Sequence, residues 1–127
     1  MILLQLAEIK ELHKMAIEEF GGLDGIRDEG ALESAFNAVL NRLNYEPDLD
    51  LAAIAATYAY HLSQAHAFHD GNKRVAAMAS ETFLDMNGVG LDFTNDEIVD
   101  IYLQIASSSL SRDSLEALFR QHIVFLG

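Results

Sequence analysis

The amino-acid sequence predicts an all-α protein made of a single domain, residues 1–127. Hydrophobic residues recur every three or four positions in six successive segments, which is the pattern of helices with one buried face. No long segment alternates polar and apolar residues as a half-buried strand does. The length fits one domain with a hydrophobic core, and the absence of cysteine excludes a disulfide framework.

The first two expected helices flank a glycine-rich connection. Apolar spacing predicts a helix over about 6–19, which Gly21 and Gly22 end. Residues 21–30 then form a loop, in which a short β-hairpin is also compatible with the sequence. Asp28 is a good N-cap for a second helix that continues to residue 43.

Two central helices are expected to meet at a loop. The segment 49–64, capped by Asp48 or Asp50, is apolar nearly all round, as a helix buried in the core is. A helix over 72–87 follows the loop, and Gly88 ends it. The loop between them is therefore held by the two best-buried elements of the domain.

Two shorter helices complete the expected bundle. Thr94 or Asn95 caps a helix that continues to about residue 106. Ser111 or Asp113 opens a last helix that includes Ile123 and Val124.

The composition excludes some classes of partner. The formal net charge is −12, so direct binding to nucleic acid is not expected, because phosphate neutralisation needs a basic surface. The apolar stretch 51–62 is much shorter than a membrane span. The sequence shows no signal-peptide pattern, and the lack of cysteine agrees with a cytoplasmic location.

The loop and the following helix start, His66 to Arg74, carry the chemistry (HAFHDGNKR). A helix start offers free N–H groups and a partial positive charge to phosphate, and Lys73 and Arg74 add two cations. Gly71 allows close backbone approach, and Asp70 could hold Mg²⁺. His66 could accept a proton from an attacking hydroxyl near neutral pH. The combination predicts a nucleotide polyphosphate site.

Each of these residues alone has an ordinary structural explanation. A single histidine is more often a packing or surface residue than a catalyst, and Asp70-Gly71 is a common turn. Phe68 is expected to anchor the loop to the core. The joint occurrence, in a loop that leads into a helix, favours the functional interpretation.

The segment His66 to Arg74 resembles the signature of the Fic/Doc family, H-x-F-x-[D/E]-[G/A]-N-[G/K]-R. The match is closest to the Doc branch, and residues 21–35 (GGLDGIRDEGALESA) also resemble that branch. The resemblance implies an all-α Fic/Doc-like bundle that uses ATP and Mg²⁺ to modify a protein hydroxyl.

The resemblance also assigns roles to individual residues. His66 matches the catalytic base, Asp70 the acid that holds Mg²⁺, and Phe68 the buried anchor. Asn72 and Arg74 match phosphate binders, beside the backbone of Gly71 and the side chain of Lys73. The glycine-rich loop over residues 21–30 matches a flap that aligns the target peptide. Its flap residues here are Gly21, Gly22, Gly25 and Arg27.

Two positions depart from the wider Fic pattern. Fic adenylyltransferases usually have glycine where this chain has Lys73, and a further arginine where it has Ala77. Doc-like proteins share both changes and resemble toxins that phosphorylate elongation factor Tu and arrest translation. The bulky cation at Lys73 favours transfer of the γ-phosphate to a serine or threonine. No internal Ser/Thr-x-x-x-Glu-Gly/Asn inhibitory run is present, so a separate antitoxin is expected.

Three alternatives remain open at this stage. The first is a Fic-type adenylyltransferase. The second is an HD-type metal phosphohydrolase built on His69-Asp70, with His61 or His66 upstream and Asp85 or Asp92 downstream. The third is a binding module without turnover. The remaining histidines, His13, His61 and His122, are otherwise assigned to packing or the surface, with no functional role.

Overall fold

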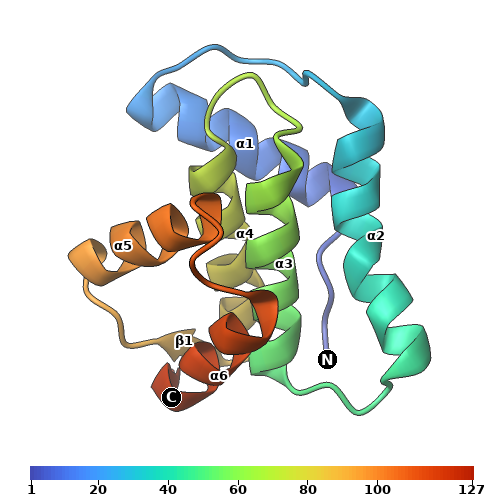
Figure 1. Cartoon of the computed structure of the whole chain (residues 1–127), viewed down its shortest axis with the longest axis vertical. Helices are drawn as coiled ribbons and strands as arrows, with labels where there is room; N and C mark the ends of the chain where they lie inside the picture. The colour runs from blue at the N-terminus through green and yellow to red at the C-terminus, as the bar shows by residue number, and fades with distance from the viewer.

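Six α-helices dominate the computed structural model, which describes residues 1–127 (Figure 1). They are α1 (Leu6–Phe20), α2 (Glu29–Tyr45), α3 (Leu51–Ala65), α4 (Asn72–Met86), α5 (Asn95–Ala106) and α6 (Arg112–His122). The strands β1 (Val89–Leu91) and β2 (Ile123–Phe125) pair as a small antiparallel sheet. The all-α prediction is confirmed, apart from this sheet. None of the helices is both long and apolar enough to cross a membrane.

The two central helices are α3 and α4, as predicted. Figure 1 shows α3 in the middle of the molecule, with α4 beside it, α2 on one flank, α5 and α6 on the other, and α1 across the top. The α3 residues from Ala52 to Ala59 are all buried, and most of them are alanines. Ala76 and Ala79 of α4 are equally buried, so the two backbones can approach closely. The loop between the two helices lies at the top of the bundle.

Side-chain caps fix where four of the helices begin, and in α6 the cap is Ser111, which accepts from the Ser114 N–H. The Asp28 carboxylate accepts from the Ala31 N–H at 3.0 Å, and Asp50 accepts from the Ala53 N–H at 2.9 Å. Thr94 and Glu97 form a capping box at the start of α5. These caps satisfy N–H groups that have no partner inside a helix. Asp28 is confirmed as an N-cap, and Asp50 rather than Asp48 caps α3.

Two expectations about extended structure were wrong. Residues 21–30 do not form a hairpin; their one bridge pairs Ile26 with Phe68 of the motif loop. The last helix stops at His122, and the β-branched Ile123 and Val124 lie in β2. The partner strand β1 offers them backbone hydrogen bonds, and this tertiary pairing overrides the helical spacing.

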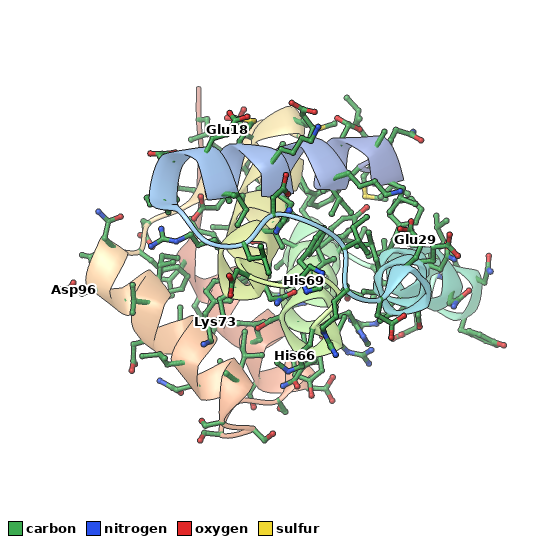
Figure 2. All side chains as sticks on the ribbon, turned by 90° about the horizontal axis from the view of Figure 1, so that it is seen from above. Glu18, Glu29, His66, His69, Lys73 and Asp96 are labelled. Carbon is green, nitrogen blue, oxygen red and sulfur yellow. The ribbon has the colours of Figure 1, made fainter.

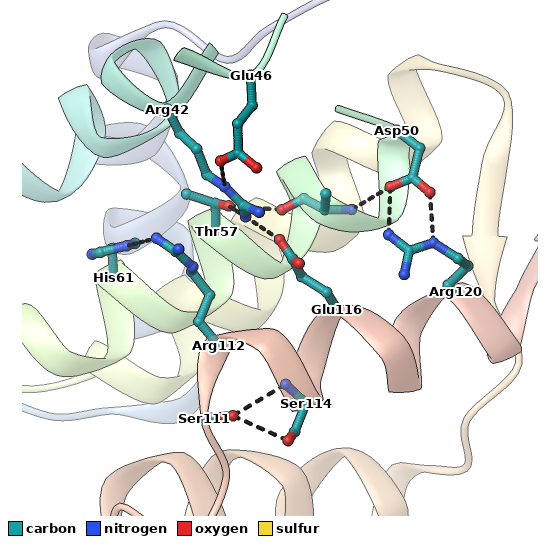
Figure 3. A network of polar contacts seen from close by, with 11 residues as sticks. Arg42, Glu46, Asp50, Thr57, His61, Ser111, Arg112, Ser114, Glu116 and Arg120 are labelled. Carbon is teal, nitrogen blue, oxygen red and sulfur yellow. Dashed lines mark hydrogen bonds and ion pairs between the residues drawn. The ribbon is translucent and has the colours of Figure 1, made fainter. Parts of the chain in front are cut away.

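A buried ionic cluster joins α2, α3 and α6 (Figure 3). The Arg42 guanidinium donates to Glu116, to Glu46 at 3.0 Å and to the Thr57 hydroxyl at 3.0 Å. The Arg42 and Glu116 side chains are 9% and 11% exposed. The hydrogen bond to Glu116 is the main reason that the pKa of Arg42 is raised. The cluster therefore stabilises the contact of α2, α3 and α6, in a part of the bundle that is distant from the motif loop.

Candidate active site

The motif loop runs between two residues with left-handed backbone. His66 terminates α3 with φ of 49°, and Gly71 starts α4 with φ of 80°. Glycine adopts such a φ freely, whereas histidine does so at a cost in energy. Between them Phe68 is 3% exposed and belongs to the hydrophobic core.

The first turn of α4 has free backbone donors. No side chain caps this helix, and the first bond of its ladder runs from the Val75 N–H to the Gly71 carbonyl at 2.9 Å. The N–H groups of Asn72, Lys73 and Arg74 therefore have no acceptor in the protein. Such a helix start attracts an anion.

Two adjacent cations stand at this helix start. Lys73 and Arg74 are exposed and make no ion pair, although the chain has 20 acidic and only 8 basic residues. The Arg74 guanidinium lies 3.5 Å from the centre of the Phe20 ring, which orients the side chain without neutralising its charge. Both positive charges therefore remain available to a ligand.

The flap, residues 21–30, is hydrogen-bonded to the motif loop. The N–H groups of Arg27 and Asp28 donate to the Ala67 carbonyl, and His69 donates to the Gly25 carbonyl at 3.2 Å. The Arg27 guanidinium also donates to the His66 carbonyl, from Nε at 3.0 Å and Nη2 at 2.5 Å. The flap thus fixes the backbone of the residue predicted to be the base. Arg27 was expected only to align a target peptide.

Asp70 faces both the flap and the solvent. Its Oδ2 accepts from the Leu23 N–H at 2.6 Å, while its Oδ1 makes no hydrogen bond. A side chain at Gly22 would bring a Cβ to 3.0 Å from the Asp70 Cβ, so only glycine allows this approach. One exposed carboxylate oxygen remains for a cation.

The Asn72 side chain serves the loop itself. Its Oδ1 accepts from the Phe68 N–H at 3.1 Å, and its Nδ2 donates to the Phe68 carbonyl at 3.0 Å. The amide therefore joins the anchor to the helix start. The Asn72 side chain is therefore engaged within the loop, and its backbone N–H is the group that stays free.

His13 of α1 contacts the motif loop, and the sequence interpretation did not predict this contact. It is 2% exposed, and its ring stacks on Phe68 with 3.8 Å between ring centres. Packing was expected, but Nε2 also lies 2.7 Å from the Asp70 carbonyl oxygen. A histidine three positions before the apolar Ala16 gives no sign of a partner 57 residues away, so the sequence held no signal for it.

The motif residues line a pocket of about 350 Å³ between the loop and α5. Its walls include His66 and the segment His69 to Arg74, together with Ser63 and Ala106, and no residue of α1. In Figure 2, His66 and Lys73 lie on the side of the flap opposite α1. A larger hollow of about 460 Å³ beside β1 carries Glu81 and Asp85 and no cation, so it does not suit a phosphate.

Comparison with known proteins gives the same assignment as the motif. The model of the Fic/DOC family matches residues 3–84. The chain is 34% identical over 114 residues to "Protein kinase doc" of Escherichia phage P1, a match that covers 90% of each chain. It is 37% identical over 103 residues to "Toxin Doc" of Mycolicibacterium smegmatis, covering 77% of this chain and 78% of that protein. The protein therefore belongs to the Fic/DOC family.

Proposed function

We propose that the protein is a Doc-like toxin that transfers the γ-phosphate of ATP to a serine or threonine hydroxyl of a target protein. One observation carries the proposal: two cations without carboxylate partners stand at an uncapped helix start beside a pocket. Catalysis of phosphoryl transfer depends on donors and cations held around the phosphate oxygens. The relatives named as a protein kinase and as a toxin support the same chemistry.

The transfer assigns one task to each group in the pocket. The target hydroxyl attacks the γ-phosphorus, and the bond from that phosphorus to the oxygen of ADP breaks. The imidazole of His66, which makes no hydrogen bond of its own, accepts the hydroxyl proton. Gly71 and the N–H groups of Asn72, Lys73 and Arg74 hold the phosphate oxygens, assisted by both cationic side chains.

Mg²⁺ fits this site through one protein carboxylate. Asp70 has a free, exposed oxygen, and Mg²⁺ is commonly held by one or two carboxylates together with substrate phosphates and water. Bound Mg²⁺ would neutralise charge on the phosphates. Asp70→Asn should raise the Mg²⁺ concentration needed for half-maximal ATP binding, and calorimetry at several Mg²⁺ concentrations measures it. An unchanged Mg²⁺ dependence would move the metal away from Asp70.

Lys73 favours phosphoryl over adenylyl transfer. A lysine places a compact charge where Fic adenylyltransferases have glycine, which suits a terminal phosphate and crowds a bridging one. Labelled ATP separates the two reactions. Label from the γ-position on the target supports the kinase, whereas label from the α-position would show adenylylation and overturn it. Lys73→Gly should lose the γ-transfer, with Lys14→Gly as an exposed control on α1.

The proposed target is elongation factor Tu, and a cognate antitoxin would restrain the toxin. The target follows from the resemblance to the Doc branch. The antitoxin follows from the relative named as a toxin and from the lack of an inhibitory segment in the chain itself. Incubation with purified elongation factor Tu and ATP, followed by mass spectrometry, tests the target. The mass of intact elongation factor Tu is expected to increase by one phosphoryl group. Modification of other translation factors, with elongation factor Tu untouched, would reject this target.

The structure lacks the cluster of metal ligands that an HD-type phosphohydrolase needs. No group of three or more histidine, aspartate or glutamate side chains in the structure is placed to hold a metal ion. His69 and Asp70 lie in the loop before Gly71, and Asp85 and Asp92 lie near the far end of α4. The geometry gives no support to this alternative.

A further inference from the structure

We infer that His13 is a positioning residue of the phosphate site, which turns the Gly71 N–H toward the ligand. The inference rests on the proposed function, because it assigns a residue outside the motif to the same pocket. A carbonyl oxygen can only accept, so the 2.7 Å contact requires that His13 Nε2 carries the hydrogen and donates it to the Asp70 carbonyl. The hydrogen bond therefore fixes one peptide group at the turn into α4.

That peptide group joins Asp70 to Gly71. In a trans peptide the C=O and N–H bonds point in opposite directions, and no peptide bond of the chain is cis. The carbonyl points to α1, so the Gly71 N–H points away from α1. The pocket lies on that side, because none of its lining residues comes from α1. His13 thereby adds the Gly71 N–H to the free donors of the α4 first turn.

The surroundings of His13 suit a fixed support. The ring is buried and lies nearly parallel to Phe68, with an interplanar angle of 11°. Its Nδ1 is 3.7 Å from the Asp24 carboxylate of the flap, so flap and helix α1 meet at this side chain. Gly71 in the left-handed region could otherwise rotate its peptide at little cost. A glycine at this turn needs a hydrogen bond from another element to keep its N–H in one direction.

Three variants separate positioning from packing. His13→Phe keeps the stacked ring on Phe68 and removes the donor. His13→Gln returns a donor near the place of Nε2, whereas the amide of His13→Asn is too short to reach it. We expect His13→Phe and His13→Asn to weaken Mg-ATP binding about five- to tenfold, the usual value of one hydrogen bond, and His13→Gln to restore most of it. The thermal midpoint shows whether each variant is folded.

Calorimetry with Mg-ATP and the amide resonance of Gly71 are the two readouts. Weaker binding in His13→Phe with recovery in His13→Gln supports the inference. Equal affinity in all variants overturns it, and so does a loss in His13→Gln as large as in His13→Phe. If His13→Phe does not fold, the pair His13→Gln and His13→Asn gives the same comparison. If the wild type binds no ATP, the proposed function fails, but hydrogen exchange of the Gly71 amide still tests whether His13 fixes this peptide group. Faster exchange in His13→Asn than in His13→Gln supports the inference. Equal exchange in the two variants overturns it.

Discussion

Arg42 and the pair Lys73–Arg74 are cations of one chain in opposite situations. The Arg42 guanidinium is nearly buried and engages two carboxylates and a hydroxyl, whereas Lys73 and Arg74 are exposed and engage none. In a chain with net charge −12, carboxylates are available for every cation. Arg42 joins helices through its partners, whereas Lys73 and Arg74 stand without partners at a helix start beside a pocket. The difference distinguishes a charge that stabilises the fold from one that remains available to bind.

The largest expected effect is a loss of catalytic rate that leaves the stability of the fold unchanged. His66→Ala should reduce transfer about 10²- to 10⁴-fold, the usual loss for a general base, because its exposed ring holds no other group in place. The thermal midpoint should stay close to that of the wild type, since the Arg27 contact uses the His66 backbone. Single-turnover rates with γ-labelled ATP measure the loss, and a wild-type rate in this variant would remove His66 from the mechanism.

The converse effect is expected at the ionic cluster. Arg42→Ala should lower the free energy of unfolding by about 3 kcal/mol, because it leaves the Glu116 carboxylate buried without its partner. Arg120→Ala is the matched control: its pair with Asp50 is about half exposed, so a loss of less than about 1 kcal/mol is expected. Urea denaturation measures both. Similar losses in the two variants would contradict the contrast between buried and exposed pairs.

Arg27 lies between the two situations, since its charge meets a neutral carbonyl. Arg27→Ala should lower kcat about tenfold, through loss of two charge-assisted hydrogen bonds that hold the left-handed backbone of His66. The KM for the target should remain unchanged, and Arg27→Lys should recover part of kcat. A higher KM for the target with unchanged kcat would instead support the target-aligning role predicted from the sequence.

The smallest expected effect is a pH dependence at His61, beside the ionic cluster. Burial, followed by the charges of Arg112 and Arg42, lowers the pKa of His61 below its ordinary 6.5. The unfolded chain then binds the proton more readily, so this contribution to stability is complete above about pH 6.5 and is lost as the pH falls through the folded pKa. The loss stays below about 1.4 kcal/mol per pH unit, the limit for one proton, because solvent screens a partly exposed ring.

The test of this contribution compares two unfolding curves. The free energy of unfolding of the wild type should fall more steeply between pH 7 and pH 5 than that of His61→Gln, measured in urea at each pH. The difference between the two curves isolates the His61 proton from the titration of the carboxylates. Parallel curves would show that His61 titrates alike in the folded and unfolded chain.

Most of the helical framework could be predicted from local sequence. Apolar spacing, the caps at Asp28 and Thr94 and the glycine at Gly71 are short-range features, so neighbouring residues are enough to indicate them. The motif likewise indicated the loop, the apolar Phe68 within it and the two cations at the next helix start, because their spacing along the chain is itself the signal.

Tertiary structure alone decided which groups the loop leaves free. The Arg27 side chain holds the His66 carbonyl 39 residues away, and His13 reaches Asp70 across 57 residues. Ile123 and Val124 followed the helical spacing but pair with β1 as a strand. Helical periodicity specifies which face of a segment is buried, and it carries no information about which distant backbone group a polar side chain meets. For that reason the sequence by itself determined the helices and the chemistry of the motif, and only packing determined how that chemistry is held in place.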